Sequence, residues 1–115
     1  MGMPGRVDRE LVAAKFMLIK DNVKQLRKLA ALPKEAFLAD PIRRAAAERM
    51  LHISIEAAVD ICSHVISVEK LRKPEHYADI PSILKEAHVL GEDVATSLVD
   101  MIKFRNILVH LYAVG

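Results

Sequence analysis

The chain has 115 residues, of which 52% are hydrophobic and 28% are charged, and its formal net charge at pH 7 is +2. This composition excludes an intrinsically disordered chain, and the length allows one domain, residues 1–115, with a core of its own. The small net charge does not by itself indicate a nucleic-acid partner, although it permits one where basic residues cluster locally.

A single cysteine, Cys62, excludes an intrachain disulfide and is typical of a protein in a reducing compartment. It lies in the apolar run AAVDICSHVI, so we expect a small packed side chain rather than a nucleophile. The first ten residues contain no apolar signal-peptide core, and no segment approaches the ~20 apolar residues that span a bilayer. We therefore expect a soluble, cytoplasmic protein with no membrane partner.

Helical periodicity predicts a first helix near the N-terminus and a longer second helix. In the first, apolar residues recur every three or four positions. The expected inner stripe consists of Val12, Phe16, Ile19, Val23, Leu26 and Ala30. After a loop-like segment at 32–41, Asp40 is the expected N-cap of the second helix, with Pro41 at its first position. The second helix carries apolar residues on two faces, so we expect it to be buried on two sides.

A second loop-like segment, 70–81, precedes a short third helix at 81–90, which Gly91 is expected to end. The fourth helix is predicted to run from Glu92 or Asp93 to about His110. No segment shows the alternating pattern of a strand. The arrangement that buries these apolar stripes is an all-α, antiparallel four-helix bundle.

The last helix contains the stretch FRNILVHLY, in which polar residues interrupt an apolar run. Arg105 falls on the apolar stripe of this helix. At about 100° per residue, it lies within about 20° of Tyr112, which is seven positions later. Asn106 and His110 are four positions apart and share a neighbouring face. The four side chains are therefore expected on one side of the last turns.

Two interpretations of these residues remain open from their chemistry. In the first, Arg105 pairs with a carboxylate of the second helix, such as Asp60 or Glu56, and His110 benefits from the helix macrodipole. Asp60 is the best carboxylate for this role, with a solvent-facing position as its alternative. In the second, the arginine offers a bidentate fork to phosphate and the histidine moves protons near neutral pH. The chain has no H-E-x-x-H or C-x-x-C spacing, so we expect no metal site and no cofactor. It has no glycine-rich loop, so we do not expect it to be a nucleotidyltransferase itself.

The pattern Arg105-Asn106-x-x-x-His110-x-Tyr112 resembles the R-x-x-x-x-H-x-Y signature of HEPN-domain toxins of the HepT type. Four further segments resemble the helices of that family in order and spacing, namely VDRELVAAKFMLIKDNVKQLRKL, AAERMLHISIEAAVDICSHVI, YADIPSILKEAHVL and MIKFRNILVHLY. The resemblance implies a HEPN-like bundle that acts as the toxin of a HEPN/MNT toxin–antitoxin system. It implies a metal-independent endoribonuclease, with RNA as substrate and an MNT-type nucleotidyltransferase antitoxin as partner.

The resemblance also implies a site at the interface of a homodimer, to which each chain contributes one arginine and one histidine. In this site His110 transfers protons, Arg105 binds and stabilises the phosphate, and Asn106 orients either the histidine or the phosphate. Tyr112 is the residue that the antitoxin is implied to AMPylate. The alternative function is a catalytically quiet HEPN module that binds a nucleotidyltransferase partner or a nucleotide.

Overall fold

The structure is a computed structural model in which residues 6–114 are described, except for the side chains at 108, 109 and 111–114. Within this range the chain forms α1 (Arg9–Ala30), α2 (Lys34–Leu38), α3 (Pro41–Val68), the 3-10 turn η1 (Tyr77–Asp79), α4 (Ile80–Glu86) and α5 (Glu92–Val114). Residues 6–114 contain no strand, so the prediction of an all-α fold is confirmed. The short helix α2 was not predicted, because its segment has the composition of a loop.

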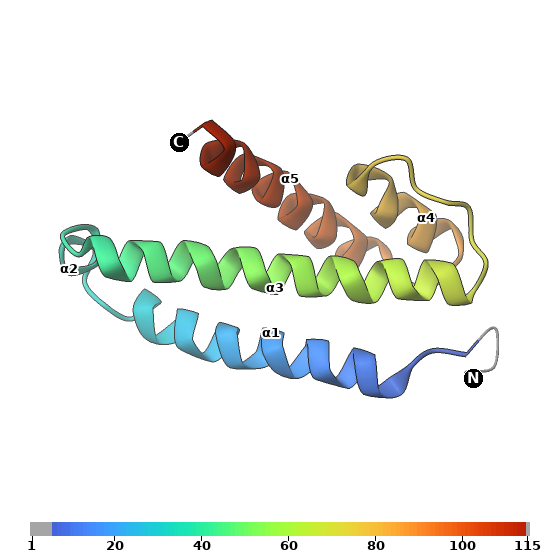
Figure 1. Cartoon of the computed structure of the whole chain (residues 1–115), viewed down its shortest axis with the longest axis horizontal. Coiled ribbons are helices and arrows are strands. Elements are labelled where there is room, and N and C mark those ends of the chain that lie inside the picture. The colour runs from blue at the N-terminus through green and yellow to red at the C-terminus, as the bar shows by residue number, and fades with distance from the viewer. Residues whose placement is uncertain (1–5, 115) are drawn as a thin grey trace.

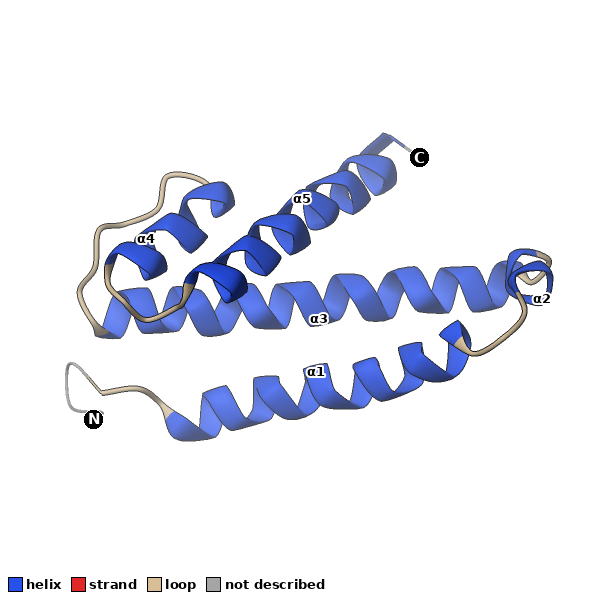
Figure 2. Ribbon diagram, turned by 180° about the vertical axis from the view of Figure 1, so that it is seen from behind, coloured by secondary structure: helices blue, strands red, loops and turns tan. Residues whose placement is uncertain are grey.

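The long helix α3 is the central element, with α1 along one side and α4 and α5 on the other (Figure 1). The chain direction reverses from α1 to α3 and again from α3 to α5, which makes both pairs antiparallel. The view from behind shows that α5 leaves α3 at an angle, whereas α1 follows α3 along most of its length (Figure 2). The central position of α3 explains why its sequence is apolar on more than one face.

The helix α3 also corrects one expectation from the sequence. With 28 residues, it is long and apolar enough to cross a bilayer by length and composition alone, contrary to the prediction that no segment approaches this limit. In the fold, however, α3 packs against helices on both sides. A helix with neighbours on several sides carries apolar residues around much of its circumference, and this produces the same composition.

The most deeply buried side chains lie where α3, α4 and α5 meet. The fully buried Ile80, Ile83 and Leu84 of α4 pack between the other two helices. Each large aliphatic side chain buried in this way contributes about 1.5–3 kcal/mol of transfer free energy. The whole cluster consists of Ile55, Val59, Ile66, Ile80, Ile83, Leu84, Leu98 and Ile102. It anchors the N-terminal half of α5, which leads into the stretch FRNILVHLY at 104–112.

The helix α1 contains no fully buried residue, because it packs chiefly against α3. Of the predicted stripe, Ile19 and Val23 are half-buried against α3, but Phe16 is 58% exposed, so its assignment to the inner face is wrong within one chain. The Cα radius of gyration is 16.1 Å, compared with about 13 Å for a compact domain of about 100 residues. The chain is therefore open, and apolar surface of α1 and α5 remains accessible.

Two predicted boundaries are decided by local chemistry. The Oδ1 atom of Asp40 accepts hydrogen bonds from the backbone N–H groups of Ile42 at 3.0 Å and Arg43 at 3.2 Å, which confirms Asp40 as the N-cap of α3. The prediction that Gly91 ends the third helix is wrong. The carbonyl of Gly91 instead accepts the N–H of Ala95 at 3.0 Å, so Gly91 belongs to the start of α5.

The helix α4 ends at Glu86 because His88 adopts the left-handed conformation, with φ of 59°. The N–H of Val89 then reaches the carbonyl of Leu84 at 2.9 Å, the bond that defines a Schellman C-cap. The same motif ends α3, where Lys70 has φ of 53° and the N–H of Leu71 reaches the carbonyl of Ile66 at 3.0 Å. Neither position carries the usual glycine, so the left-handed caps themselves are not predictable from the residue types, although the loop-like segment at 70–81 does indicate that α3 ends near Val68.

Candidate functional site

The guanidinium of Arg105 is held by side chains from three elements. Its Nε donates a hydrogen bond to Oε1 of Glu56 on α3 at 2.6 Å, and its Nη1 donates to Oδ1 of the adjacent Asn106 at 3.1 Å. The ring of Tyr77, in η1, lies under the guanidinium, with 4.2 Å between the arginine Cζ atom and the ring centroid. The Arg105 side chain is 20% exposed, so it is neither buried in the core nor freely solvated.

The structure corrects the predicted support for Arg105. Glu56, and not Asp60, holds the arginine, whereas Asp60 forms an ion pair of 2.9 Å with Lys15 of α1. Because α3 and α5 are antiparallel, residues later in α5 lie opposite residues earlier in α3. Asp60 lies one turn, about 6 Å, further along α3, on the stretch that faces α1. Glu56 is therefore the carboxylate within reach.

Glu56 has a second basic neighbour. The Nε2 atom of His52, one turn earlier on α3, lies 3.6 Å from the same Oε1 atom that accepts from Arg105. The two residues attract each other electrostatically only when the imidazole is protonated. They border a charged hollow of about 210 Å³ between α1 and α3. Its lining consists of Lys15, Leu18, Arg49, His52, Ile53, Glu56, Ala57 and Asp60.

His110 is exposed and lies on a different face of α5 from Arg105. Five residues separate the two, which corresponds to about 140° around the helix. Asn106 stands one turn before His110 and contacts Arg105, so it lies between the two faces. Within one chain the structure thus joins Arg105 to Asn106, whereas His110 lies on a different face of α5 from Arg105. The side chain of Tyr112, predicted on the Arg105 face, lies outside the described residues.

The other titratable groups considered from the sequence, Cys62 and His64, take part in packing and hydrogen bonding within the fold. Cys62 packs against the core cluster, and burial raises the pKa of its thiol to about 11, which opposes formation of a nucleophilic thiolate. The Nε2 atom of His64 accepts the backbone N–H of Asp8 at 2.8 Å and so ties the start of α1 to α3. Among residues 6–114 whose side chains are described, no group of three or more His, Cys, Asp or Glu residues is arranged to hold a metal ion.

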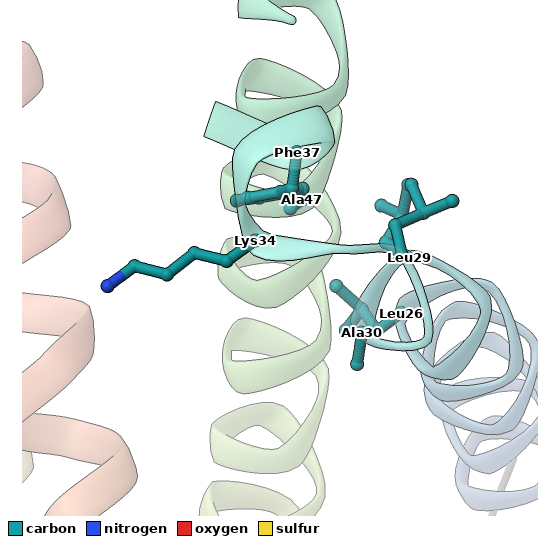
Figure 3. Close-up of a pocket in the computed structure, with 7 residues that line it drawn as sticks. Leu26, Leu29, Ala30, Lys34, Phe37 and Ala47 are labelled. Carbon is teal, nitrogen blue, oxygen red and sulfur yellow. The ribbon is translucent and has the colours of Figure 1, made fainter. Parts of the chain in front are cut away.

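The helices also enclose two apolar hollows. One, of about 370 Å³, is formed where α1, α2 and α3 meet, and Figure 3 shows Lys34 pointing away from its apolar lining side chains. None of the predicted site residues lines it. The other, of about 350 Å³, is a groove between α1, α3 and α5. Its lining consists of Ile19, Val23, Leu26, Leu51, Ser54, Ile55, Asp100, Met101 and Phe104.

Two of the residues that hold Arg105 were missed or not preferred from the sequence. From the sequence, Glu56 is one of two candidate carboxylates, and Tyr77 falls in the loop-like segment 70–81, which predicts no role for it. Helical spacing identifies residues on the same helix face, but Tyr77 is in η1, and nothing in its spacing connects it with Arg105. Only the packing of η1 against α5 brings the pair together.

Comparison with solved structures defines the class of fold. A solved structure described as "Crystal structure of the toxin-antitoxin with AMP-PNP" is similar to this fold, with a TM-score of 0.81 at 22% sequence identity. The similarity covers 89% of this chain and 76% of that chain. The cytosolic protein of unknown function YutE from Bacillus subtilis matches with a TM-score of 0.77 at 25% identity, over 95% of this chain and 72% of that chain. The fold is thus a helical bundle of the type found in these two proteins.

The family follows from the sequence profile. The family described as Ribonuclease HepT-like matches residues 19–114, which include all of α2 to α5 and the Arg105–His110 motif. The chain therefore belongs to the HepT-like ribonuclease family, and the resemblance seen in its sequence is confirmed. No curated protein sequence matches the chain.

Proposed function

We propose that this protein is the toxin of a HEPN/MNT toxin–antitoxin system and that it cleaves RNA without a metal ion, at an Arg/His site shared by two chains. The observation that carries the proposal is the motif Arg105–His110 in a member of the HepT-like ribonuclease family, with the arginine braced at the surface. The similarity to a toxin–antitoxin structure supports the fold on which this role depends.

Arg105 is suited to bind a phosphate group. Its Nε and one Nη1 hydrogen are engaged by Glu56 and Asn106, while both hydrogens of Nη2 lie outside these two bonds. A guanidinium keeps its charge at any physiological pH and offers donors in one plane, which matches the oxygens of a phosphate. In the proposed reaction Nη2 and the remaining Nη1 hydrogen bind the non-bridging oxygens as negative charge grows on the phosphorane.

The cleavage step requires two proton transfers. A base removes the proton of the ribose 2′-hydroxyl, whose oxygen attacks the neighbouring phosphorus and forms a 2′,3′-cyclic phosphate. The bond from phosphorus to the 5′-oxygen breaks, and an acid protonates that oxygen. One chain provides a single motif histidine, His110, so two chains are needed to supply one base and one acid. His110 is exposed, as contact with a substrate or a second chain requires.

A homodimer is consistent with the open form of one chain. Phe104 is 38% exposed and Ile107 is 57% exposed, and both flank the motif on α5. Phe104 also lines the groove between α1, α3 and α5, whose surface is almost entirely apolar. Exposed apolar surface of this kind favours association. In the proposed dimer these residues bring the two α5 helices together, so that the Arg105 of one chain and the His110 of the other lie near one phosphate.

The proposed partner is an MNT-type nucleotidyltransferase antitoxin that transfers AMP to Tyr112. On an ideal helix this residue falls within about 20° of Arg105. An adenylyl group there would add a negative phosphate beside the arginine and compete with RNA for it. The toxin–antitoxin structure with a similar fold is described as being with AMP-PNP, a nucleotide analogue.

A second candidate function is favoured by one specific contact. The short bond from Arg105 to Glu56 offsets part of the arginine charge, as expected of a purely structural ion pair. Under this alternative the chain is a catalytically quiet HEPN module that binds a nucleotidyltransferase partner or a nucleotide. It predicts that purified protein binds such a partner and leaves RNA intact.

The test is cleavage of RNA by the purified protein and by two matched variants. His110→Asn removes the proposed proton-transfer group and should lower the cleavage rate about 10²–10⁴-fold. His88→Asn is the control, because His88 is also exposed and its left-handed conformation accepts asparagine. We expect this control to cleave at the wild-type rate. If His110→Asn stays within a few-fold of wild type, the assignment of His110 is wrong, and if wild type does not cleave, the alternative function is favoured.

A further inference from the structure

We propose that Tyr77 is a positioning residue for Arg105, and that it holds the guanidinium in the plane in which Nη2 faces the substrate phosphate. The inference rests on the proposed function, because there Arg105 is the group that binds phosphate. It assigns a role to η1, the turn between α3 and α4, which lies outside the Arg105–His110 motif.

The contacts of Arg105 divide into two kinds. Glu56 and Asn106 accept hydrogen bonds at the edge of the guanidinium and so fix its direction within its own plane. Tyr77 covers a face of the same group, with 4.2 Å between Cζ and the ring centroid, a distance well inside the range of a cation–π contact. A ring on the face restrains tilting of the plane, which the hydrogen bonds at the edge restrain less.

The two kinds of contact differ in their effect on charge. Glu56 carries a full negative charge, so it attracts Arg105 but also reduces the positive potential that a phosphate would experience. The Tyr77 ring is neutral, and it holds the guanidinium through its quadrupole without removing its charge. An aromatic neighbour therefore fixes the orientation of an anion-binding arginine and lowers its affinity for the anion less than a second carboxylate would.

Tyr77 is itself held in place by a defined turn. The Oδ2 atom of Asp79 accepts the backbone N–H groups of Glu75 and His76, each at 3.0 Å, and the Asp79 N–H donates to the carbonyl of His76 at 3.0 Å. The bond from the His76 backbone is the main reason that the pKa of Asp79 is lowered, so this carboxylate is charged at neutral pH. The next residue, Ile80, is fully buried in the core cluster. The turn that carries Tyr77 is thus fixed by the hydrogen bonds of Asp79 and by the burial of Ile80 in the core.

The first measurement observes the guanidinium of Arg105 by NMR in the absence of RNA. In ¹H–¹⁵N NMR spectra the Arg105 Nε–Hε signal is assigned by its loss in Arg105→Lys. In Tyr77→Leu, which keeps an apolar side chain without a π face, we expect this signal to move and its hydrogen exchange to accelerate. Tyr77→Phe should leave it near the wild-type position. Phe16→Leu is the control, because Phe16 is an exposed aromatic residue of α1, and it should leave the signal unchanged.

The second measurement uses a single-stranded RNA with 2′-O-methyl riboses, which binds but has no attacking hydroxyl. We expect Tyr77→Leu to weaken binding about 3- to 30-fold, the range of a partly desolvated cation–π contact, and Tyr77→Phe to bind within about twofold of wild type. In the Arg105→Ala background, Tyr77→Leu should have no further effect, because a positioning residue acts through the group it positions. Tyr77→Met, similar in length, replaces the leucine variant if thermal unfolding shows that the latter is not folded.

The outcomes separate this inference from the proposed function. An unchanged Nε–Hε signal in Tyr77→Leu, or independent and additive effects of the Tyr77 and Arg105 changes on binding, would overturn the positioning role. Weaker RNA binding by Tyr77→Leu, seen only when Arg105 is present, supports the positioning role. This holds even if the wild-type protein does not cleave unmodified RNA, because that result contradicts only the proposed catalysis. If wild type does not bind the methylated RNA at all, the positioning role for phosphate is overturned as well.

Discussion

Glu56 of α3 and Arg105 of α5 are 49 positions apart in the chain and share a hydrogen bond of 2.6 Å. The bond engages the Nε atom, and the terminal Nη1 atom donates separately to Asn106. One contact therefore serves the fold, by linking the central helix to the last one, and also orients the charged group that we assign to phosphate binding.

Arg105→Lys should be nearly as damaging to RNA cleavage as Arg105→Ala. Lysine retains the charge but has one nitrogen, which cannot donate to Glu56 and Asn106 and also present two donors to a phosphate. Steady-state cleavage rates of the two variants provide the measurement. If the lysine variant cleaves at a rate close to wild type, a diffuse positive potential is sufficient and the planar fork is not required.

A dimer formed through α5 should be disrupted by Ile107→Glu, because Ile107 is 57% exposed beside the motif and a carboxylate there would have to be desolvated in the interface. Light scattering should give twice the mass of one chain for wild type at micromolar concentration and the mass of one chain for the variant. Ile42→Glu, at an 80% exposed position at the start of α3, is the control and should remain dimeric. A monomeric wild type would contradict the proposed shared site.

Tyr112→Phe should remain toxic but escape neutralisation by the antitoxin. Phenylalanine keeps the ring and removes only the phenolic oxygen that would accept AMP, whereas the proposed catalysis by Arg105 and His110 does not use that oxygen. Co-expression with intact and with catalytically inactive nucleotidyltransferase, scored by growth and by the mass of the toxin, gives the measurement. An inactive antitoxin that protects cells as well as the intact one, with no AMP added, would mean neutralisation by occlusion.

Cys62 should be unreactive in the folded protein at neutral pH. With its pKa raised to about 11, on the order of one thiol in ten thousand is ionised at pH 7, so alkylation by iodoacetamide should be slow until the chain unfolds. The same shift predicts a loss of stability as pH rises from about 9 to about 11, because the thiol then ionises in the unfolded chain but not in the folded one. Cys62→Ala should lack this part of the pH dependence in denaturant titrations, and an equal dependence in both proteins would contradict it.

Lys70→Gly and His88→Gly should each stabilise the fold. Both residues hold the left-handed conformation of a Schellman C-cap, which costs a side chain with a Cβ atom about 1 kcal/mol relative to glycine. Greater freedom of glycine in the unfolded chain offsets part of this gain, so we expect about 0.5 kcal/mol in the free energy of unfolding. Gly91→Ala is the control, because a Cβ atom there would meet nothing within 4 Å. If both glycine variants are as stable as wild type or less stable, the left-handed conformation of Lys70 and His88 does not cost the fold stability.

The sequence by itself determined the elements that depend on neighbours within a few positions. Apolar spacing identified the four main helices, and Asp40 with Pro41 marked the start of α3 through a cap that uses only adjacent backbone groups. The motif residues Arg105 and His110 were likewise recognised from their spacing, and the family match now confirms the family they indicated. These features are readable because they depend only on residues within the same helix or directly beside it.

Only the tertiary structure decided which residues meet across helices. The antiparallel register of α3 and α5 selects Glu56 over Asp60, although the two carboxylates are one turn apart on the same helix. The packing of η1 brings Tyr77 to Arg105, and the open position of α1 leaves Phe16 exposed. Helical periodicity carries no information about axial register, loop path or the number of neighbouring helices, because these depend on how whole elements pack and not on the spacing within any one of them.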